Sequence, residues 1–151
     1  MAHVRITTFV AASPELVFEL WTDLERWPEW IEGLSRITDV TGPLDQAGTS
    51  YVTWFGGMIG RNEVLEVERP RRIRTHLSSR LLRGVTEAVF DPERGGTRIT
   101  QSFETEGLLP AIAARIFAMG SYRGSFRGEL TTFARLAERE ARARRPAERE
   151  G

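Results

Sequence analysis

The chain has no cysteine among its 151 residues. Disulfides, thiolate zinc sites, iron–sulfur clusters and thiol nucleophiles are therefore excluded as the basis of its fold or activity. It has only two histidines, His3 and His76, and their separation does not fit a metal site. We expect neither a metal nor a cofactor.

Neither sign of charge is in excess. The chain contains 21 basic and 21 acidic residues, so its formal net charge is zero, and every basic residue is arginine. Such a balance offers no electrostatic surface for nucleic acid or for an anionic membrane, and we expect no nucleic-acid partner. We attribute the absence of lysine to coding bias rather than to function.

Long apolar runs are also missing. No run approaches the roughly 18 residues that a transmembrane helix needs, so no integral membrane segment is expected. Residues 1–5 lack the basic segment followed by an apolar core that marks a signal peptide. The sequence therefore predicts a cytoplasmic protein.

The order of elements can be predicted from the residue pattern. Residues 4–10 alternate between two faces, which is typical of a half-buried strand. Ser13 followed by Pro14 indicates the start of a helix, because serine caps the first turn and proline has no N–H to leave unpaired there. A second short helical piece is expected over 24–31. Further strands, separated by turn residues, are expected at 34–40, 49–55, 59–68, 72–78, 85–90 and 97–105.

The C-terminal segment has apolar residues every three or four positions, as in an amphipathic helix. These residues are Ile112, Ile116, Met119, Phe126, Leu130, Phe133 and Ala137. A helix of about 35 residues cannot bury its apolar stripe alone, and a sheet with one apolar face cannot bury that face alone. We therefore predict an α+β fold in which a curved, seven-stranded antiparallel sheet encloses the helix and leaves a cavity. We predict one domain over 1–142 and a charged, disordered tail over 143–151.

Several stretches carry a resemblance to a known family. They are 12–18 (ASPELVF), 22–30 (TDLERWPEW), 47–49 (AGT), 66–73 (EVERPRRI), 95–100 (GGTRIT) and the end of the last helix. With these stretches the chain resembles the polyketide cyclase/dehydrase-like (SRPBCC) proteins of the START-like superfamily. The resemblance implies a helix-grip fold with a hydrophobic cavity between the long helix and the sheet. The family's roles range from lipid transport through hormone binding to aromatic polyketide cyclisation, and a shared fold does not choose among them.

Large apolar side chains near the expected cavity are candidate ligand contacts, since such groups line most pockets. The candidates are Trp30, Tyr51, Phe55, Met58, Phe90, Phe103 and Met119. Any one of them is better explained as core, but we expect some of the set to line the pocket. Trp54 has the opposite parity to Tyr51 and is expected outside, whereas Trp27 is expected to close the end of the sheet.

The last helix contains Gly120, Gly124 and Gly128, spaced four apart. Each glycine costs about 1 kcal/mol relative to alanine inside a helix. The strip therefore either leaves room for a ligand or allows close packing on the sheet. Arg123 continues the apolar spacing of this helix and is a candidate anchor for a ligand carboxylate or phenolate; the alternatives are a solvated arginine or a structural pair with a glutamate.

No catalytic constellation is present in the sequence. The glycines of 56–60 are not followed by the Lys-Ser/Thr of a P-loop, and there is no Gly-x-Ser-x-Gly motif. Arg61 and Glu63 are expected to pair on the outer face rather than to enter the cavity, and His76 is expected to face water.

The sequence thus predicts that the chain binds or transports a hydrophobic small molecule, such as a lipid, an isoprenoid or a polyketide. One alternative is a polyketide cyclase/dehydratase-type enzyme, in which an arginine or a tyrosine stabilises an enolate. The other is a non-catalytic interaction module or homodimer, with Phe9 in an exposed patch.

Overall fold

The computed structural model describes the backbone of residues 3–55, 58–80, 83–106 and 121–150, and the side chains of 4–55, 58–80, 83–106 and 128–144. The elements are β1 (His3–Val10), α1 (Pro14–Trp21), the 3-10 helix η1 (Leu24–Glu29), β2 (Arg36–Thr38), β3 (Ser50–Phe55), β4 (Met58–Glu68), β5 (Arg72–Ser79), β6 (Arg83–Glu93), β7 (Gly96–Thr105) and α3 (Ser121–Glu150). Among these helices, none is long and apolar enough to cross a membrane.

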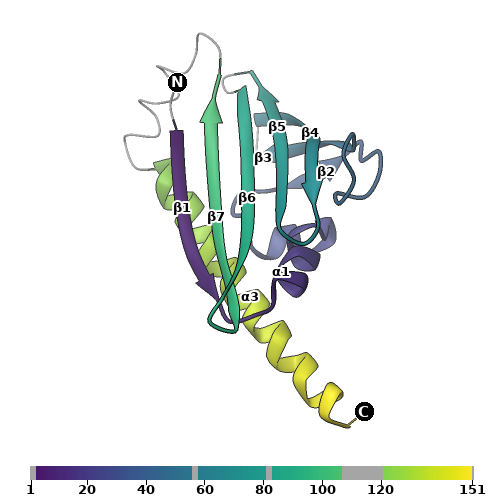
Figure 1. Cartoon of the computed structure of the whole chain (residues 1–151). Coiled ribbons are helices and arrows are strands. Elements are labelled where there is room, and N and C mark those ends of the chain that lie inside the picture. Colours follow the sequence, from purple (N-terminus) through teal and green to yellow (C-terminus); the bar gives the residue numbers. More distant parts are fainter. Residues whose placement is uncertain (1–2, 56–57, 81–82, 107–120, 151) are drawn as a thin grey trace.

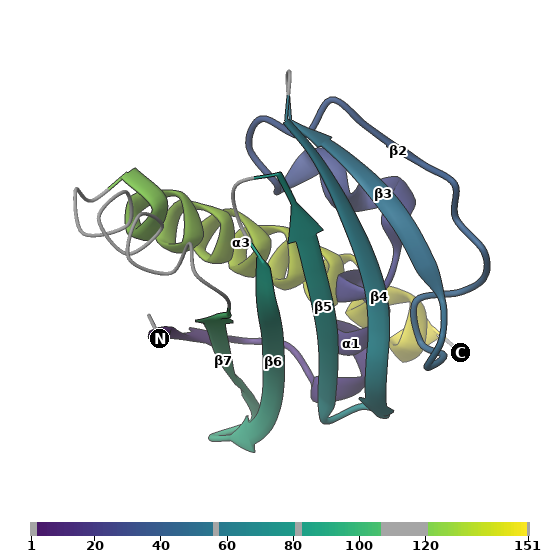
Figure 2. The ribbon, with the colours of Figure 1, turned by 90° about the horizontal axis from the view of Figure 1, so that it is seen from above.

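The seven strands form one antiparallel sheet in the order β1-β7-β6-β5-β4-β3-β2. Helix α3 runs diagonally along one side of this sheet, and α1 lies on the same side (Figure 1). Seen from above, the strands arch around α3 (Figure 2). The predicted α+β helix-grip architecture is confirmed.

Helix α1 begins as the sequence predicts. The Ser13 side chain accepts a hydrogen bond from the backbone N–H of Leu16 at 3.3 Å, and Pro14 occupies the first helical position. The buried hydroxyl of Thr97 donates to the carbonyl of Ala12 at 2.7 Å. This bond joins the start of β7 to the residue just before the helix cap, so it sets where α1 leaves the sheet.

The second short helix is the 3-10 helix η1, which ends at Glu29 rather than at residue 31. The Asp23 side chain caps it by accepting from the N–H of Glu25 at 3.2 Å. Trp27 is buried, and its indole Nε1 donates to the carbonyl of Trp21 at 2.8 Å. This bond connects η1 to the end of α1 and turns the Trp27 ring toward the inside of the sheet.

Two strands differ in length from the sequence-based expectation. β2 has three residues instead of seven, and it is followed by Asp39, whose φ of 55° cannot continue a strand. β6 extends through Glu93, because the hairpin turns at Arg94 and Gly95 alone, with φ of 49° and 78°. Positive φ at both central residues is what a tight two-residue hairpin needs. The sequence pattern predicts a turn over the whole run 91–96, whereas the structure confines the turn to these two residues.

Strand β4 contains one extra residue. Its pairing with β5 shifts between Val64 and Glu66, so Leu65 has no partner in the register. The bulge leaves Leu65 exposed, while Val64 before it is buried and Val67 after it is partly buried against the core. Because a bulge bends a strand and increases its twist, this residue contributes to the curvature of the sheet.

Helix α3 continues through Glu150 and so includes most of the segment 143–151. That this segment is a disordered tail in solution stays a prediction. Alanine, arginine and glutamate all favour helix, so their alternation is compatible with a continued rod. The guanidinium of Arg144 donates to both carboxylate oxygens of Glu19 in α1, at 3.1 and 3.2 Å, and lies 3.6 Å from Glu140.

An aromatic cluster joins both α-helices, η1 and the sheet. The ring of Phe133 on α3 lies 5.1 Å from Trp21 and 4.9 Å from Trp30, measured between centroids. The ring of Phe90 on β6 lies 5.4 Å from Trp21 and 6.0 Å from Phe18. All four contacts are edge-on, a geometry worth about 0.5–1.5 kcal/mol per pair beyond burial. This cluster is the centre of the core.

We predict opposite effects of alanine at two glycines. A Cβ at Gly96 would clash with the carbonyl oxygen of Val10 and lie 2.7 Å from the Phe9 ring, so Gly96→Ala should lower the free energy of unfolding by about 2–3 kcal/mol. At Gly128 in α3 a Cβ meets no described atom within 4 Å, so Gly128→Ala should raise it by about 0.5–1 kcal/mol. Urea denaturation of both variants measures the difference, and a loss of stability in Gly128→Ala would contradict the open space assigned there.

Candidate functional site

A cavity of about 110 Å³ lies between the inner face of the sheet, η1 and α3. Its wall consists of Trp21, Trp27, Trp30, Ile31, Leu44, Tyr51, Ile73, Thr75, Thr86, Glu87, Ala88, Gln101 and Glu129. The volume is below the roughly 300–1,000 Å³ of pockets that take drug-sized ligands. The cavity has room for one end of a larger molecule.

Aromatic rings form the apolar part of the wall. Trp21 and Trp30 pack at 4.9 Å between centroids, Trp27 and Trp30 at 6.2 Å, and Trp27 and Tyr51 at 5.6 Å. The indole N–H of Trp27 is used by the carbonyl of Trp21, but Nε1 of Trp30 has no hydrogen-bond partner among the described residues. Because Trp30 is only 5% exposed, this N–H is a buried donor without an acceptor.

Three strands, β3, β5 and β7, supply polar groups to the same cavity. Burial raises the pKa of the Tyr51 hydroxyl on β3, and a hydrogen bond with the side chain of Thr75 on β5 opposes the rise, so this hydroxyl is neutral at physiological pH. Gln101 on β7 places its side-chain oxygen in the wall, where that atom is buried and has no partner in the described part of the chain. Two polar atoms of the wall, one on Trp30 and one on Gln101, are thus free to bind a ligand.

Glu129 on α3 is a carboxyl group in the cavity wall whose pKa is shifted from its ordinary value. Burial, and to a smaller extent the negative charge of Glu32, raise the pKa of its carboxyl to about 7. The carboxyl is therefore close to half protonated at neutral pH, and it can both donate and accept a proton there. A carboxyl group with a shifted pKa inside a cavity is a candidate functional residue.

Sequence reasoning missed Glu129, Gln101 and Thr75. One observation pointed to Glu129: it lies three residues after Phe126 and four before Phe133, so it falls on the apolar stripe of the last helix. Gln101 shares the inward parity of buried Ile99 and Phe103, and it could have been found in the same way.

The predicted ligand contacts separate into two groups. Trp30 and Tyr51 are brought together in the cavity wall. Phe90 and Phe103 are fully buried, but they belong to the core and do not line the cavity. Trp27, expected only to close the end of the sheet, is part of the wall as well.

The other predicted contacts lie away from this wall. Phe55 is half-buried near the end of β3, beside Gly33. Met58 is 47% exposed, because it starts β4 directly after the hairpin and pairs with the last residue of β3. Met119 lies outside the described residues, and Arg123 lies in α3 with a side chain outside the described ones. Whether any predicted contact binds a ligand stays a prediction.

The opposite face of the sheet has a different character. Arg61 and Glu63 are exposed there, and Nε2 of His76 lies 2.7 Å from a carboxylate oxygen of Glu106. Trp54 is also on this face, with the guanidinium of Arg36 stacked 3.9 Å above its ring. The directions predicted for these residues agree with the structure.

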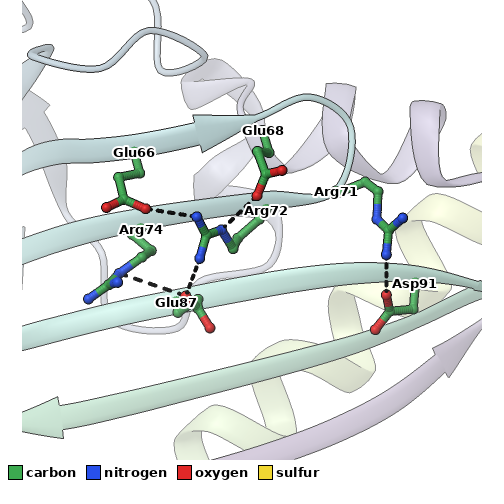
Figure 3. A network of polar contacts seen from close by, with 7 residues as sticks. All are labelled: Glu66, Glu68, Arg71, Arg72, Arg74, Glu87 and Asp91. Carbon is green, nitrogen blue, oxygen red and sulfur yellow. Dashed lines mark hydrogen bonds and ion pairs between the residues drawn. The ribbon is translucent and has the colours of Figure 1, made fainter.

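A network of ion pairs extends over β4, β5 and β6 on the face away from the helices (Figure 3). The Arg72 guanidinium contacts Glu66 at 2.8 Å, Glu68 at 3.1 Å and Glu87 at 3.5 Å, and Arg74 contacts Glu87 at 3.7 Å. These side chains are about a third exposed or more, so the network is a solvated charged surface of modest stabilising effect. Of its members, Glu87 is also among the residues that line the cavity.

The different hydrogen bonding of Trp27 and Trp30 predicts that phenylalanine at these two positions has different effects on the free energy of unfolding. Trp27→Phe leaves the carbonyl of Trp21 without its donor, whereas Trp30→Phe removes an N–H that has no partner in the described part of the chain. We expect Trp27→Phe to be less stable than Trp30→Phe by about 1–2 kcal/mol, because both changes remove the same atoms from neighbouring rings and differ in this bond. Chemical denaturation measures it; a Trp30→Phe protein that is the less stable of the two would contradict the assignment.

The raised pKa of Glu129 predicts a pH dependence of stability. Between about pH 4.5 and pH 7 the folded chain keeps a proton that the unfolded chain releases, so the free energy of unfolding should fall as pH rises through this window. Glu129→Gln should lose less stability than the wild type between pH 5 and pH 8 in melting experiments. The exposed Glu104→Gln serves as the control, and an identical pH profile in wild type and Glu129→Gln would refute the prediction.

Comparison with known proteins supports the fold. In the curated proteins no significant match was found. Two solved structures resemble this one over most of both chains: CV1439 from Chromobacterium violaceum (18% identity, 90% of this chain and 96% of that one, TM-score 0.69) and MLL2253 from Mesorhizobium loti (16%, 91% and 98%, TM-score 0.74). The di-domain ARO/CYC StfQ from the steffimycin biosynthetic pathway is similar too (17%, 92% of this chain, TM-score 0.70), and the match spans 52% of its length.

The sequence itself matches a family model over residues 1–138, nearly the whole chain. That model describes polyketide cyclase/dehydrase and lipid transport proteins. Together with the sheet that encloses a C-terminal helix, this match confirms the resemblance found in the sequence. The chain belongs to the polyketide cyclase/dehydrase and lipid transport family.

Proposed function

We propose that the chain binds a small, mainly apolar molecule in the cavity between η1, α3 and the sheet. The observation that carries this proposal is the composition of the wall. Tryptophan and tyrosine rings supply apolar surface, while Nε1 of Trp30 and Oε1 of Gln101 are buried without partners among the side chains that the structure describes. Apolar walls with a few free polar groups are typical of small-molecule sites, and a ligand would satisfy the two atoms.

The size of the cavity limits what can enter. A cavity of about 110 Å³ is smaller than the engineered cavity of roughly 150 Å³ that binds benzene. A lipid, an isoprenoid or a polyketide would therefore place only one end inside, and the remainder would extend beyond the described wall. Transport of such a molecule is a more specific version of this binding proposal.

A second candidate is an enzyme of the polyketide cyclase/dehydratase type. It is favoured by Glu129, whose pKa of about 7 suits proton transfer at neutral pH, and by the neutral Tyr51 hydroxyl in the same cavity. In such an enzyme the cavity would hold a reactive chain in position, and the donors would stabilise an enolate. Turnover of a poly-β-keto substrate that is lost in Tyr51→Phe would support this candidate over simple binding.

Two further expectations accompany the proposal. A cytoplasmic location would be tested by cell fractionation. A homodimer through Phe9, which is 44% exposed on the edge strand β1, would be tested by the mass in solution of the wild type and Phe9→Ser.

The binding proposal is tested by filling the cavity. Ala88 is buried in its wall on β6, and Ala88→Leu would place three more carbons in the empty space. Val89→Leu, on the opposite parity of the same strand, is the matched control. We expect small aromatic molecules to raise the melting temperature of the wild type and of Val89→Leu, and to leave that of Ala88→Leu unchanged.

Native mass spectrometry of freshly purified protein adds an independent readout, since a tightly held ligand would appear as extra mass. The proposal fails if no ligand co-purifies and no aromatic or lipid probe shifts the melting temperature of the wild type. It also fails if Ala88→Leu responds to the probes as the wild type does, because binding would then lie elsewhere.

A further inference from the structure

The polar groups of the cavity indicate which ligands it would select, an inference that rests on the proposed function. The N–H of Trp30 is a donor that cannot accept, and its side chain is 95% buried, as its exposed fraction of 5% shows. Glu129 lines the same small cavity, so a molecule that fills it can contact both groups. The Tyr51 hydroxyl is already engaged by Thr75. Trp30 and Glu129 are therefore the groups that remain for recognition, together with Gln101.

An anion fits this set of groups poorly. The described residues of the wall include no arginine, and the ionisable ones are Tyr51, Glu87 and Glu129. The carboxylate of Glu87 pairs with Arg72 and Arg74 on the outer face, and the charge of Glu32 acts on Glu129 from the loop after η1. A ligand carboxylate would approach Glu129 with no opposite charge among these side chains, which is costly inside a protein.

A cation fits only in part. It would pair with an ionised Glu129, but an ammonium or amidinium group brings donors alone, and the N–H of Trp30 would stay without an acceptor. A neutral molecule with an acceptor oxygen satisfies Trp30 and can also accept from a protonated Glu129. Gln101 can present either its oxygen or its nitrogen by turning its amide.

We propose that the cavity selects a neutral ligand carrying a carbonyl oxygen, and that Glu129 and Trp30 set this selectivity by donating hydrogen bonds to that oxygen. The pKa of Glu129, raised to about 7 by burial and by Glu32, keeps the proton on the carboxyl in mildly acidic solution. Above pH 7 the ionised group can only accept, so it would repel the carbonyl oxygen. The preference for a carbonyl should therefore weaken as pH rises.

Four compounds of the same planar shape, which differ only in the small end that would enter the cavity, test this selectivity. Acetophenone carries a carbonyl, α-methylstyrene replaces its oxygen by CH₂, benzoate is the anion and benzamidinium the cation. At pH 6 we expect the wild type to bind acetophenone about tenfold more tightly than each of the other three, as two neutral hydrogen bonds would give. At pH 8 the advantage over α-methylstyrene should shrink severalfold, and titration calorimetry measures each affinity.

Variants of Glu129 separate hydrogen bonding from shape. Glu129→Gln keeps a neutral donor, so it should keep the preference for acetophenone and lose its dependence on pH. Glu129→Met has a similar length and no donor, so it should lose most of the preference while still binding α-methylstyrene. Trp30→Phe should reduce the preference in the same way, and the exposed Glu104→Gln is the control for charge alone. Thermal melting of each variant verifies that it is folded.

The outcomes distinguish this inference from the proposed function. Equal affinities for acetophenone and α-methylstyrene in the wild type would overturn the inference and leave cavity binding supported. Tighter binding of benzamidinium would overturn it in favour of a cation. Tighter binding of benzoate, abolished in Arg123→Ala, would overturn it in favour of the predicted arginine anchor. Binding of none of the four would overturn both the inference and the proposed function.

Discussion

The packing of Phe133 against Trp21 and Trp30 is the contact on which the rest of the structure depends. Phe133 comes from α3, Trp21 from the end of α1 and Trp30 from the residue after η1. Through Trp21 the cluster reaches Phe90 on the sheet. A curved sheet has an inner face that no single helix covers, and these rings join three helical segments into one cover. The cavity exists where this cover does not reach the inner face of the sheet.

The same aromatic cover determines the chemistry of the cavity. Trp21, Trp27 and Trp30 each present a ring to the interior, but their N–H groups are not equivalent: that of Trp27 is bound to a backbone carbonyl, and that of Trp30 is not. Glu129 lies four residues before Phe133, close to the ring that holds α3 in place. Burial by this packing is the main cause of its raised pKa. The packing that stabilises the fold thus also accounts for the raised pKa of the ionisable group in the cavity.

Much of the fold could be predicted from the sequence, because the alternation of apolar and polar residues in a strand and the capping of a helix each depend on residues close together in the chain. The Ser13-Pro14 start of α1, the strand over residues 4–10 and the antiparallel pairing of consecutive strands from β2 to β7 follow from residues close together in the chain. The short β2 and the long β6 were not predicted, since each depends on backbone angles at one or two residues. The bond between Arg144 and Glu19 spans 125 positions in the sequence, so this contact between α3 and α1 does not follow from a local pattern.

The site was harder to predict for a related reason. Trp30 and Tyr51 were identified as candidates by their size and parity, but large buried rings such as Phe90 and Phe103 look the same in a sequence and belong to the core. What distinguishes the two kinds is empty space, which depends on how distant elements pack. Glu129 and Gln101 were overlooked because polar residues on an apolar stripe are usually solvated.

The bulge at Leu65 has a consequence for the charge distribution of the molecule. In a regular strand, Glu66 would point the same way as Val64, and Val67 would point outward. One extra residue reverses the phase of everything after it, so that Val67 enters the apolar interior and Glu66 and Glu68 reach the guanidinium of Arg72. A single unpaired position in β4 thereby keeps two carboxylates off the concave inner face of the sheet and places them on its solvent-exposed outer face.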